Sequence, residues 1–454
     1  MSPTSSASST SPVAALVARL SDDIRSGAFP PGMALPTHRK LAAQYGIAVA
    51  SATKVYAKLR DLGLVVGETG RGTFVRDRPM QREWDVDDEA RLSSSAVDLS
   101  FNHPSWPDRS ELLRSTLREL TTAGDLSALL HQQPPGGRRH EREIVAAYLR
   151  DTRGIDVPGE RVFLVGGAQQ GLDVVVRAAL RPGDAVAVDA LTYPGFRMTA
   201  SLAGLTLKPV PFAEGVPDLD ALEATCRHHA VRAIYTMPTL HNPLGGVLNE
   251  AQRRRLVDIA RRYDCLIVED ATYAYLVDDA PASVVTLAPE RTFHVASISK
   301  SVATGLRFGH VVTPASHAGA LMRVIRATYW SLPSLVTAIA TRWMAGGDIV
   351  RQEERQRESA KRRQAVARKV LRGMEVVAHP SSLFLWLPLP EGLRMDRVAS
   401  ALAASGIAVS KAQAYATTRH APHALRLGLS SMTDEQVEPV LTAVREVIER
   451  FPVE

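Results

Sequence analysis

Residues 297–309 read SISKSVATGLRFG. Lys300 stands between the small hydroxyl residues Ser299 and Ser301, and Arg307 follows seven positions later. A lysine that forms a Schiff base must attack as a neutral amine. Serine hydroxyls and the fork of an arginine are groups that hold a phosphate beside such an amine. The stretch therefore predicts an anchor for pyridoxal phosphate, and a polar loop with a solvated lysine is the alternative.

The composition sets the class of protein. The chain has 454 residues, of which 45% are apolar, so two or three globular domains are expected. Its two cysteines, Cys226 and Cys265, cannot form a disulfide framework and fit a reducing cytosol. No apolar run is long enough to cross a bilayer, and the Ser/Thr-rich start lacks the pattern of a signal peptide. We expect a cytoplasmic protein with a disordered tail over residues 1–11, no membrane partner and no metal site.

The positive charge is concentrated near the N-terminus. Residues 1–80 hold ten Lys and Arg against five Asp and Glu, which places +5 of the net charge of +6 in the first sixth of the chain. A small basic unit attached to a nearly neutral body is typical of proteins that bind nucleic acid. A basic face that is simply solvated is the alternative.

The apolar pattern within this basic unit predicts a helix-turn-helix. Helical spacing is found over residues 13–26, 38–45 and 50–62. Glycines follow each run, and Thr37 can cap the second helix. Two helices joined by a tight turn around Gly46 are a helix-turn-helix signature.

Two short strands, 64–66 and 72–75, then predict a hairpin wing. Together these features resemble the winged helix-turn-helix of the GntR superfamily over residues 12–76. The resemblance is carried by Gly27, Pro31-Gly32, Leu35-Pro36, Arg39, Leu41-Ala42, Leu59, Gly63-Leu64 and Gly70-Arg71-Gly72-Thr73-Phe74-Val75.

The resemblance implies that the third helix enters the major groove of double-stranded DNA and that the wing reaches the minor groove. The implied DNA contacts are Thr37, Arg39, Ser51, Thr53, Lys54 and Arg71. Family members usually carry a Ser-Arg pair before the recognition helix, and this chain has Ala48-Val49 there. Ser51, Thr53 and Lys54 are therefore expected to supply more of the contact. Plain surface charge is the alternative for Arg39 and Lys54.

Residues 77–97 lack apolar periodicity, which predicts a linker. Beyond them, short Val/Ile/Leu runs alternate with amphipathic helices, which is typical of parallel βαβ units. The predicted strands are 162–165, 185–188, 233–236, 265–268 and 293–296.

Candidate ligand-binding residues follow these strands. Gly167, Ala168 and Gln169 lie at a strand-to-helix turn whose amides can hold a phosphate, although many such turns are structural. Tyr193 could stack on an aromatic ring or fill a loop. Asn242 and Asp270 follow strand ends, where open α/β sheets bind ligands.

The motifs Gly-Ala-Gln-Gln, Tyr-Pro, Asn-Pro-x-Gly, Asp-x-x-Tyr and Ser-x-Ser-Lys stand in that order. They resemble the fold type I, class I/II aminotransferase superfamily over residues 98–450. The resemblance implies an α/β pyridoxal phosphate-dependent transferase, with a large sheet domain over about 140–345 and a smaller C-terminal α+β lobe over about 375–450. A long charged helix, about 348–374, is expected to link them, with its charges solvated or at a subunit boundary, of which a solvated face is favoured.

The same resemblance implies a role for each matching residue. Lys300 would form the Schiff base, Asp270 would pair with the pyridine nitrogen, and Tyr193 would stack on the ring. Asn242 and Tyr273 would hydrogen-bond the ring hydroxyl. The implied phosphate ligands are Gly167, Ala168, Gln169, Ser297, Ser299 and Arg307.

Arg426 lies where this superfamily places the arginine that binds a substrate carboxylate. An interdomain salt bridge is the alternative for it. Gln132 stands where family members often carry a tyrosine that reaches a neighbouring subunit's cofactor. The loops 101–106 and 411–415 are expected to set the specificity of the pocket.

A GntR-like unit followed by an aminotransferase-like body resembles the MocR-type regulators. The resemblance implies a homodimer that binds a double-stranded DNA operator and responds to pyridoxal phosphate, an amino acid or another amine. A working aminotransferase with a secondary DNA-binding module is the alternative, since Lys300, Asp270 and Arg426 are what transamination needs. A third interpretation is a sensor of cofactor level.

Overall fold

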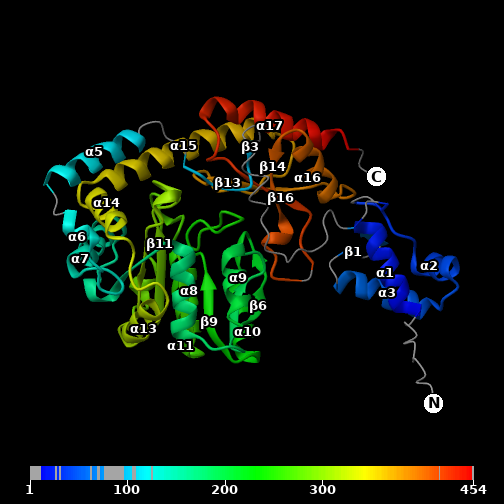
Figure 1. The fold of residues 1–454 in the computed structure, drawn as a ribbon, viewed down its shortest axis with the longest axis horizontal. Helices are drawn as coiled ribbons and strands as arrows, with labels where there is room; N and C mark the ends of the chain where they lie inside the picture. Colours follow the sequence, from blue (N-terminus) through cyan, green and yellow to red (C-terminus); the bar gives the residue numbers. More distant parts are fainter. Residues whose placement is uncertain are drawn as a thin grey trace, which may run out of the picture. The chain divides into compact units, whose positions relative to one another are not determined.

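A computed structural model of the chain divides into two compact units, Met1–Ser94 and Ser95–Glu454. The described residues are 12–25, 28–29, 32–61, 64–68, 72–75, 97–104, 109–123, 126–418 and 420–451. The predicted tail 1–11, the wing residue Arg71 and residues 77–96 of the predicted linker lie outside these ranges. Figure 1 draws the chain coloured from its N-terminus to its C-terminus.

The described residues of the first unit form three helices and a hairpin, as predicted. They are α1 (Pro12–Arg25), α2 (His38–Tyr45), α3 (Val49–Asp61) and the antiparallel strands β1 (Val65–Glu68) and β2 (Gly72–Val75). Thr37 caps α2, because its Oγ1 accepts a hydrogen bond from the backbone nitrogen of Lys40 at 3.3 Å. Gly46 ends that helix at φ 63°, a conformation in which a Cβ would be strained.

One apolar core holds the first unit together. Its buried side chains are Leu16, Val17, Leu20, Ile24, Leu35, Leu41, Ala42, Ala52, Val55, Tyr56, Leu59, Leu64, Val65 and Val75. Tyr56 satisfies its buried hydroxyl by donating to the carbonyl of Pro36 at 2.5 Å. Because α3 buries one face in this core, its other face, with Thr53 and Lys54, is exposed.

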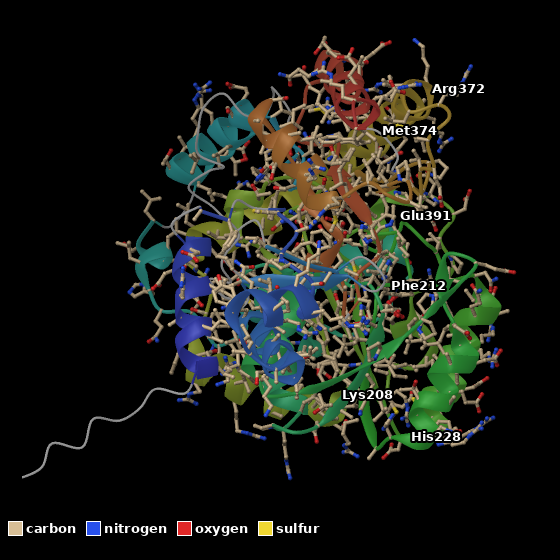
Figure 2. The ribbon with its side chains drawn as sticks, turned by 90° about the vertical axis from the view of Figure 1, so that its right-hand side faces the viewer. Lys208, Phe212, His228, Arg372, Met374 and Glu391 are labelled. Atoms are coloured by element: carbon tan, nitrogen blue, oxygen red, sulfur yellow. The ribbon has the colours of Figure 1, made fainter. Side chains whose placement is uncertain are left out.

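The second unit is built on a seven-stranded sheet in the order β4-β12-β11-β10-β9-β5-β6. Its strands are β4 (Val162–Val165), β5 (Ala185–Asp189), β6 (Thr206–Val210), β9 (Val231–Thr236), β10 (Leu266–Asp270), β11 (Thr292–Ser297) and β12 (Gly309–Val312). The neighbours from β6 to β11 pair in parallel, which confirms the predicted βαβ units. The edge strand β6 carries Lys208, labelled in Figure 2, and an edge lysine disfavours pairing with another chain.

Strand β12 departs from the prediction of parallel units. It runs antiparallel to both β11 and β4. The chain returns from β11 through residues 298–308 with no crossover helix, and a direct return reverses the strand direction. This loop carries Lys300 and begins beside the C-terminal end of β10, because β10 and β11 are adjacent and parallel.

Helices cover both faces of the sheet in three layers (Figure 1). The helices α8 (Ala168–Ala179) and α13 (Ala318–Thr328) pack on one face. The other face is covered by α7 (Arg139–Arg153) and α14 (Ser334–Ala345) near β4, and by α10 (Leu219–His228) and α11 (Glu250–Arg262) near β9. Shorter or peripheral helices are α5 (Arg109–Ala123), α6 (Leu126–Leu130), α9 (Pro194–Leu202) and α12 (Val284–Leu287).

The helix α15 (Asp348–Val370) leads into the predicted C-terminal lobe. The lobe contains β13 (Phe384–Pro388), α16 (Met395–Ala404), β14 (Ile407–Ala408), β15 (Ser410–Lys411), β16 (Ala424–Gly428) and α17 (Asp434–Glu449). Strand β3 (Val97–Asp98) pairs with β14, so the first described residues of this unit belong to the lobe. The helix α15 ends before the predicted Met374, and Gly373 follows in the left-handed region at φ 91°.

The prediction that the charges of α15 are solvated is wrong for part of the helix. Glu353 and Arg363 are only 4% and 7% exposed, because the helix packs against both α14 and α17. Arg363 donates to Asp434 Oδ1 at 2.8 Å and to the carbonyl of Leu429 at 2.7 Å. These buried polar contacts tie α15 to the lobe.

Candidate functional site

Asp270 is the last residue of β10 and is almost fully buried. Its Oδ2 accepts a hydrogen bond from Tyr235 Oη at 2.8 Å, and its Oδ1 accepts two from Thr272, at 3.0 Å from N and 2.6 Å from Oγ1. Burial raises the pKa of Asp270, and the hydrogen bonds from Thr272 and Tyr235 oppose that rise. The carboxylate is thus held in a fixed orientation in a place that favours a cationic partner.

Lys300 lies in the loop between β11 and β12. Its Nζ donates to the backbone carbonyl of Asn102 at 2.9 Å and stands 3.9 Å from the centre of the Phe101 ring. Tyr275 Oη donates to the backbone carbonyl of Lys300 at 2.7 Å. The segment before α5 therefore positions the Lys300 amine, and Tyr275, which follows Asp270 in the chain, positions the Lys300 backbone.

Arg426 of β16 is 3% exposed and lies at the centre of a polar cluster. Its Nε donates to Asn242 Oδ1 at 3.0 Å, and its guanidinium lies 4.4 Å from the centre of the Phe384 ring. The amide of Asn102 is best satisfied when its Oδ1 accepts from Arg426 Nη2 at 2.7 Å and from Tyr273 Oη at 3.1 Å. The structure thus brings together Arg426, Asn242 and Tyr273, which the sequence placed far apart.

Two of the predicted phosphate ligands, Gly167 and Arg307, meet where β4 leads into α8. Gly167 precedes that helix at φ 88°, and Arg307 Nη2 donates to the neighbouring carbonyl of Gly166 at 3.0 Å. A Cβ at Gly167 would lie 2.9 Å from Arg307 Nη2, so only glycine lets the arginine approach this closely. Gly309 packs equally closely on Gly167 and pairs across the sheet with Ser297.

Unsatisfied donors of the lysine loop and of the start of α8 fit a phosphate group. Ser299 Oγ is buried and has no hydrogen-bond partner among the described residues. The helix α8 begins at Ala168 without a side-chain cap, so its first amides and its positive end face the turn. Gln169 donates from Nε2 to Gly195 O at 3.0 Å, which fixes it between the turn and α9.

Tyr193 immediately precedes α9, and its ring packs on Gly195 so closely that a Cβ there would overlap it. Burial raises the pKa of the Tyr193 phenol, the negative charge of Asp270 raises it further, and Arg307 opposes the rise. Tyr193 therefore lies within the electrostatic reach of both the candidate pyridine partner and the candidate phosphate ligand.

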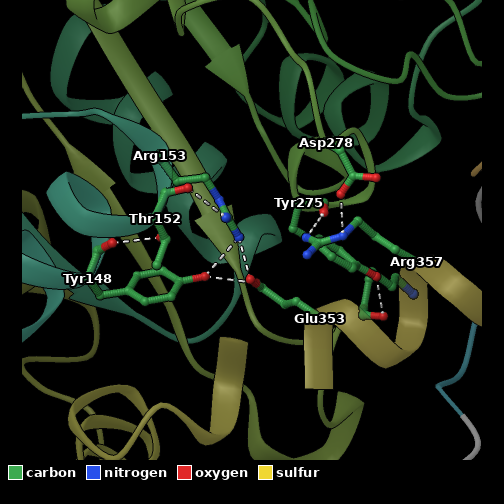
Figure 3. Close-up of polar contacts among 8 residues, drawn as sticks. Tyr148, Thr152, Arg153, Tyr275, Asp278, Glu353 and Arg357 are labelled. Atoms are coloured by element: carbon green, nitrogen blue, oxygen red, sulfur yellow. Dashed lines mark hydrogen bonds and ion pairs between the residues drawn. The ribbon is translucent and has the colours of Figure 1, made fainter. Parts of the chain in front are cut away.

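Behind the site, buried polar contacts link α7, α15 and the residues after Asp270 (Figure 3). Glu353 accepts from Arg153 Nη2 at 2.5 Å and from Tyr148 Oη at 2.8 Å. One turn along α15, Arg357 donates from Nη1 to the carbonyl of Tyr275 at 2.8 Å. Because Tyr275 also binds the backbone of Lys300, α15 supports the lysine loop through one intermediate residue.

Four of the candidate DNA contacts lie on α2 and α3. Arg39, Thr53 and Lys54 are exposed, and Ser51 is half-buried. Thr53 Oγ1 donates to the carbonyl of Val49 at 3.1 Å, so its methyl group rather than its hydroxyl donor is available outward.

Sequence reasoning missed several residues of the site. Asn102 falls in a loop that was expected to affect specificity, but nothing in the sequence marks it as the partner of Arg426. Tyr235 and Thr272 were missed as partners of Asp270, although period-two alternation on neighbouring strands could have placed Tyr235 on the face of Asp270.

Two family models match the chain. The model for aminotransferase class I and II matches residues 94–444, and the model for bacterial regulatory proteins of the gntR family matches residues 12–75. The chain belongs to the class I and II aminotransferase family. This family depends on pyridoxal phosphate, and the GntR module at the N-terminus confirms the predicted MocR-type architecture.

Full-length relatives share both parts. An uncharacterized HTH-type transcriptional regulator, YdeF of Bacillus subtilis (strain 168), is 24% identical over 440 residues, spanning 96% of this chain and 94% of that protein. The HTH-type pyridoxine biosynthesis transcriptional regulator PdxR of Corynebacterium glutamicum is 24% identical over 427 residues, spanning 93% and 92% of the two chains.

The aminotransferase-family fold is also seen in LysN, an α-aminoadipate aminotransferase of Thermus thermophilus crystallised with N-(5'-phosphopyridoxyl)-L-leucine. The TM-score is 0.71 at 23% identity, over 79% of this chain and 93% of that one. Within the described ranges, no helix is long and apolar enough to span a membrane, and no group of His, Cys, Asp and Glu side chains could hold a metal ion.

Proposed function

We propose that this member of the aminotransferase family is a pyridoxal phosphate-dependent, DNA-binding transcription regulator. Its large unit senses the cofactor, an amino compound, or both. One observation carries the proposal: Lys300 and Arg426 bind the same residue, Asn102, the lysine through the carbonyl at 2.9 Å and the arginine through the amide. An amine-reactive group and a carboxylate-binding group therefore share one site, in a chain that begins with a GntR-family module.

The cofactor would be held by residues near the C-terminal edge of the sheet. Asp270 would pair with the ring nitrogen, Asn242 and Tyr273 would bind the ring hydroxyl, and Tyr193 would cover the ring. The phosphate would be bound by Gly167, Ala168, Gln169, Ser297, Ser299 and Arg307. When bound, pyridoxal phosphate supplies an aldehyde that condenses with amines and a ring that withdraws electrons.

The effector would be an amino acid or a related amine with a carboxylate. Arg426 is buried among Phe384, Tyr415 and Tyr273, and a buried guanidinium binds a carboxylate more strongly than an exposed one. Regulation requires that the ligand favour one of two states of the protein that differ in DNA affinity. Since DNA is the proposed partner, we place the protein in the cytoplasm.

Two other functions stay open to test. The first is a working aminotransferase, because Lys300, Asp270 and Arg426 are all in place. The second is a sensor of cofactor level, which the similarity to a regulator of pyridoxine biosynthesis favours. In the first case turnover should reach a few per second or more, and in the second pyridoxal phosphate alone should change DNA affinity.

A homodimer would use an exposed apolar face. Four leucines on α5 and α6 are 36–90% exposed: Leu113, Leu117, Leu126 and Leu130. A second copy is the proposed occupant, because proteins of this fold family are commonly dimeric. Leu126→Ser combined with Leu130→Ser should yield monomers by light scattering, whereas Leu202→Ser, at a separate leucine that is 81% exposed, should not. Dimers that persist in the double variant would exclude this surface.

The central test compares purified wild type and Lys300→Ala. Pyridoxal phosphate should give wild type a visible absorbance band that resists dialysis, and Lys300→Ala should lack it. Operator affinity is then measured for cofactor-free, cofactor-loaded and amino acid-loaded protein. Identical affinities in the three states would refute the sensing role, and a band that survives in Lys300→Ala would remove the lysine from its proposed role.

A further inference from the structure

Residues 97–104, here called the strap, are bound to the C-terminal lobe. Besides the pairing of β3 with β14, Leu99 N donates to Ala408 O at 2.8 Å and Gly428 N donates to Leu99 O at 2.5 Å. Ser431 Oγ donates to Phe101 O at 2.8 Å. The strap thus follows the position of the lobe.

The strap also occupies the ligand-binding groups of the site. Arg426 Nη1 donates to Ser100 O at 3.4 Å, and Arg426 Nη2 lies 2.7 Å from Asn102 Oδ1. Lys300 Nζ donates to Asn102 O at 2.9 Å. Lys300 and Arg426, the two groups that would bind an amino acid, are therefore both hydrogen-bonded to residues 100–102 of the strap.

A carboxylate bound by Arg426 needs the same donors. A bidentate pair uses two parallel N–H groups of the guanidinium, and Arg426 Nε is already directed at Asn242 Oδ1 at 3.0 Å. The two Nη nitrogens are those that now donate to Ser100 and Asn102. The strap and a carboxylate consequently compete for one arginine, and the side chain of Asn102 determines how strongly the strap competes.

The strap packs tightly against β16, which restricts small shifts of its backbone. A Cβ at Gly428, two residues after Arg426, would lie 2.6 Å from Phe101 O and 2.8 Å from the side-chain amide of Asn102. The backbone of β16 therefore contacts the strap directly. In the sequence, residues 76–96 connect the strap to the GntR-family unit, so a displaced strap moves the end of that connection.

We propose that the strap is a ligand-responsive element and that Asn102 is its positioning residue. A carboxylate that binds Arg426 replaces Asn102 and Ser100 as partners of the guanidinium and loosens the strap. This inference rests on the proposed function, because it requires a ligand with a carboxylate at Arg426. It adds the route by which occupation of the site reaches the connection to the DNA-binding unit.

Two probes separate the carboxylate from the rest of the ligand. N-(5'-phosphopyridoxyl)-L-leucine carries the phosphate, the ring and a carboxylate, and pyridoxamine phosphate carries the first two only. Hydrogen–deuterium exchange of peptides covering residues 97–104 is measured on the full chain with each probe at saturation. The leucine conjugate should speed exchange severalfold, and pyridoxamine phosphate should leave it unchanged. Unchanged or slower exchange with bound conjugate would overturn the proposal.

Variants test the role of Asn102. Asn102→Ala should show fast exchange of the strap without ligand and little further change with the conjugate. Ser431→Ala, which also loses a contact to the strap but not to Arg426, should keep the wild-type response. Gly428→Ala should mimic Asn102→Ala by displacing the strap from β16, which keeps the test decisive should Asn102→Ala fold poorly. If neither probe binds, as followed by ring absorbance, the proposed function itself fails and the strap inference falls with it.

Discussion

At the scale of single residues, Asp270 combines a cost for folding with a proposed role in binding. Burial raises its pKa, so the native chain binds this proton more tightly than the unfolded chain does. Stability is therefore lost as pH rises above the ordinary carboxyl pKa of about 4. Asp270→Asn should raise the free energy of unfolding of the cofactor-free protein at pH 7 by on the order of 1 kcal/mol, and the gain should shrink towards pH 4.

The same substitution should weaken binding of pyridoxal phosphate at least tenfold in an absorbance titration, because the ring nitrogen loses its anionic partner. Urea unfolding at both pH values measures the stability effect, with the exposed Asp258→Asn as the control. A change in the free energy of unfolding that is equal at pH 4 and pH 7 would contradict the argument.

The neighbouring residues Glu269 and Asp270 show what sequence can resolve. Both stand at the end of an apolar strand, and period-two alternation sends them to opposite faces. Glu269 accepts hydrogen bonds from Val284 N at 3.1 Å and Val285 N at 3.0 Å, at the start of α12. The motif alone selected Asp270 for the cofactor. The capping role of Glu269 could not be predicted, because its partners lie in a helix of four residues.

A buried histidine pair on the sheet should make the protein sensitive to acid. Burial, with smaller contributions from the neighbouring His294 and Arg153, lowers the pKa of His310 to about 3. The native chain keeps this ring neutral while the unfolded chain takes up a proton below about pH 6.5, so stability is lost as pH falls from 6.5 towards 3.

His310→Gln should reduce the slope of the free energy of unfolding against pH by up to ~1.4 kcal/mol per pH unit. Urea unfolding of the two proteins between pH 4 and 7 measures the slopes. His140→Gln, at an exposed position, is the matched control and should leave the slope unchanged. Parallel slopes for wild type and His310→Gln would show that the ring titrates normally in the folded protein.

At the scale of elements, α15 supports the site through its buried charge (Figure 3). Glu353→Gln would leave the guanidinium of Arg153, 22% exposed, without its anionic partner. Removing one member of a buried ion pair costs about 3–5 kcal/mol. The comparison is with Lys369, also on α15, whose Nζ lies 3.4 Å from Oε1 of the exposed Glu438. Glu438→Gln removes that partner and should cost less than about 1 kcal/mol. Similar urea midpoints for the two variants would show that the buried pair adds nothing to stability.

The elements that sequence missed share a physical reason. The partners Arg153 and Glu353 are 200 positions apart, and Asn102 lies 198 positions from Lys300, so no local pattern marks either pair. Strand β12 has four residues and returns without a crossover helix, which leaves no βαβ signal to detect. Lys300 and Asp270 could be proposed from sequence because each belongs to a motif at or just after a strand end, and Arg426 because it is an arginine among the apolar residues of a late strand.

At the scale of the whole molecule, ligand sensing and DNA binding must be coupled in both directions. If an amino acid changes operator affinity by some factor, operator DNA must change the affinity for that amino acid by the same factor. Coupling of this kind is typically 5–150-fold. Titration of cofactor-loaded protein with the amino acid, with and without saturating operator, should therefore give two dissociation constants whose ratio equals the shift seen in DNA titrations. Arg426→Gln should bring both ratios to one while leaving operator binding without ligand intact, because that residue lies outside the GntR-family unit. A DNA shift without the matching ligand shift would place the effector somewhere other than this chain.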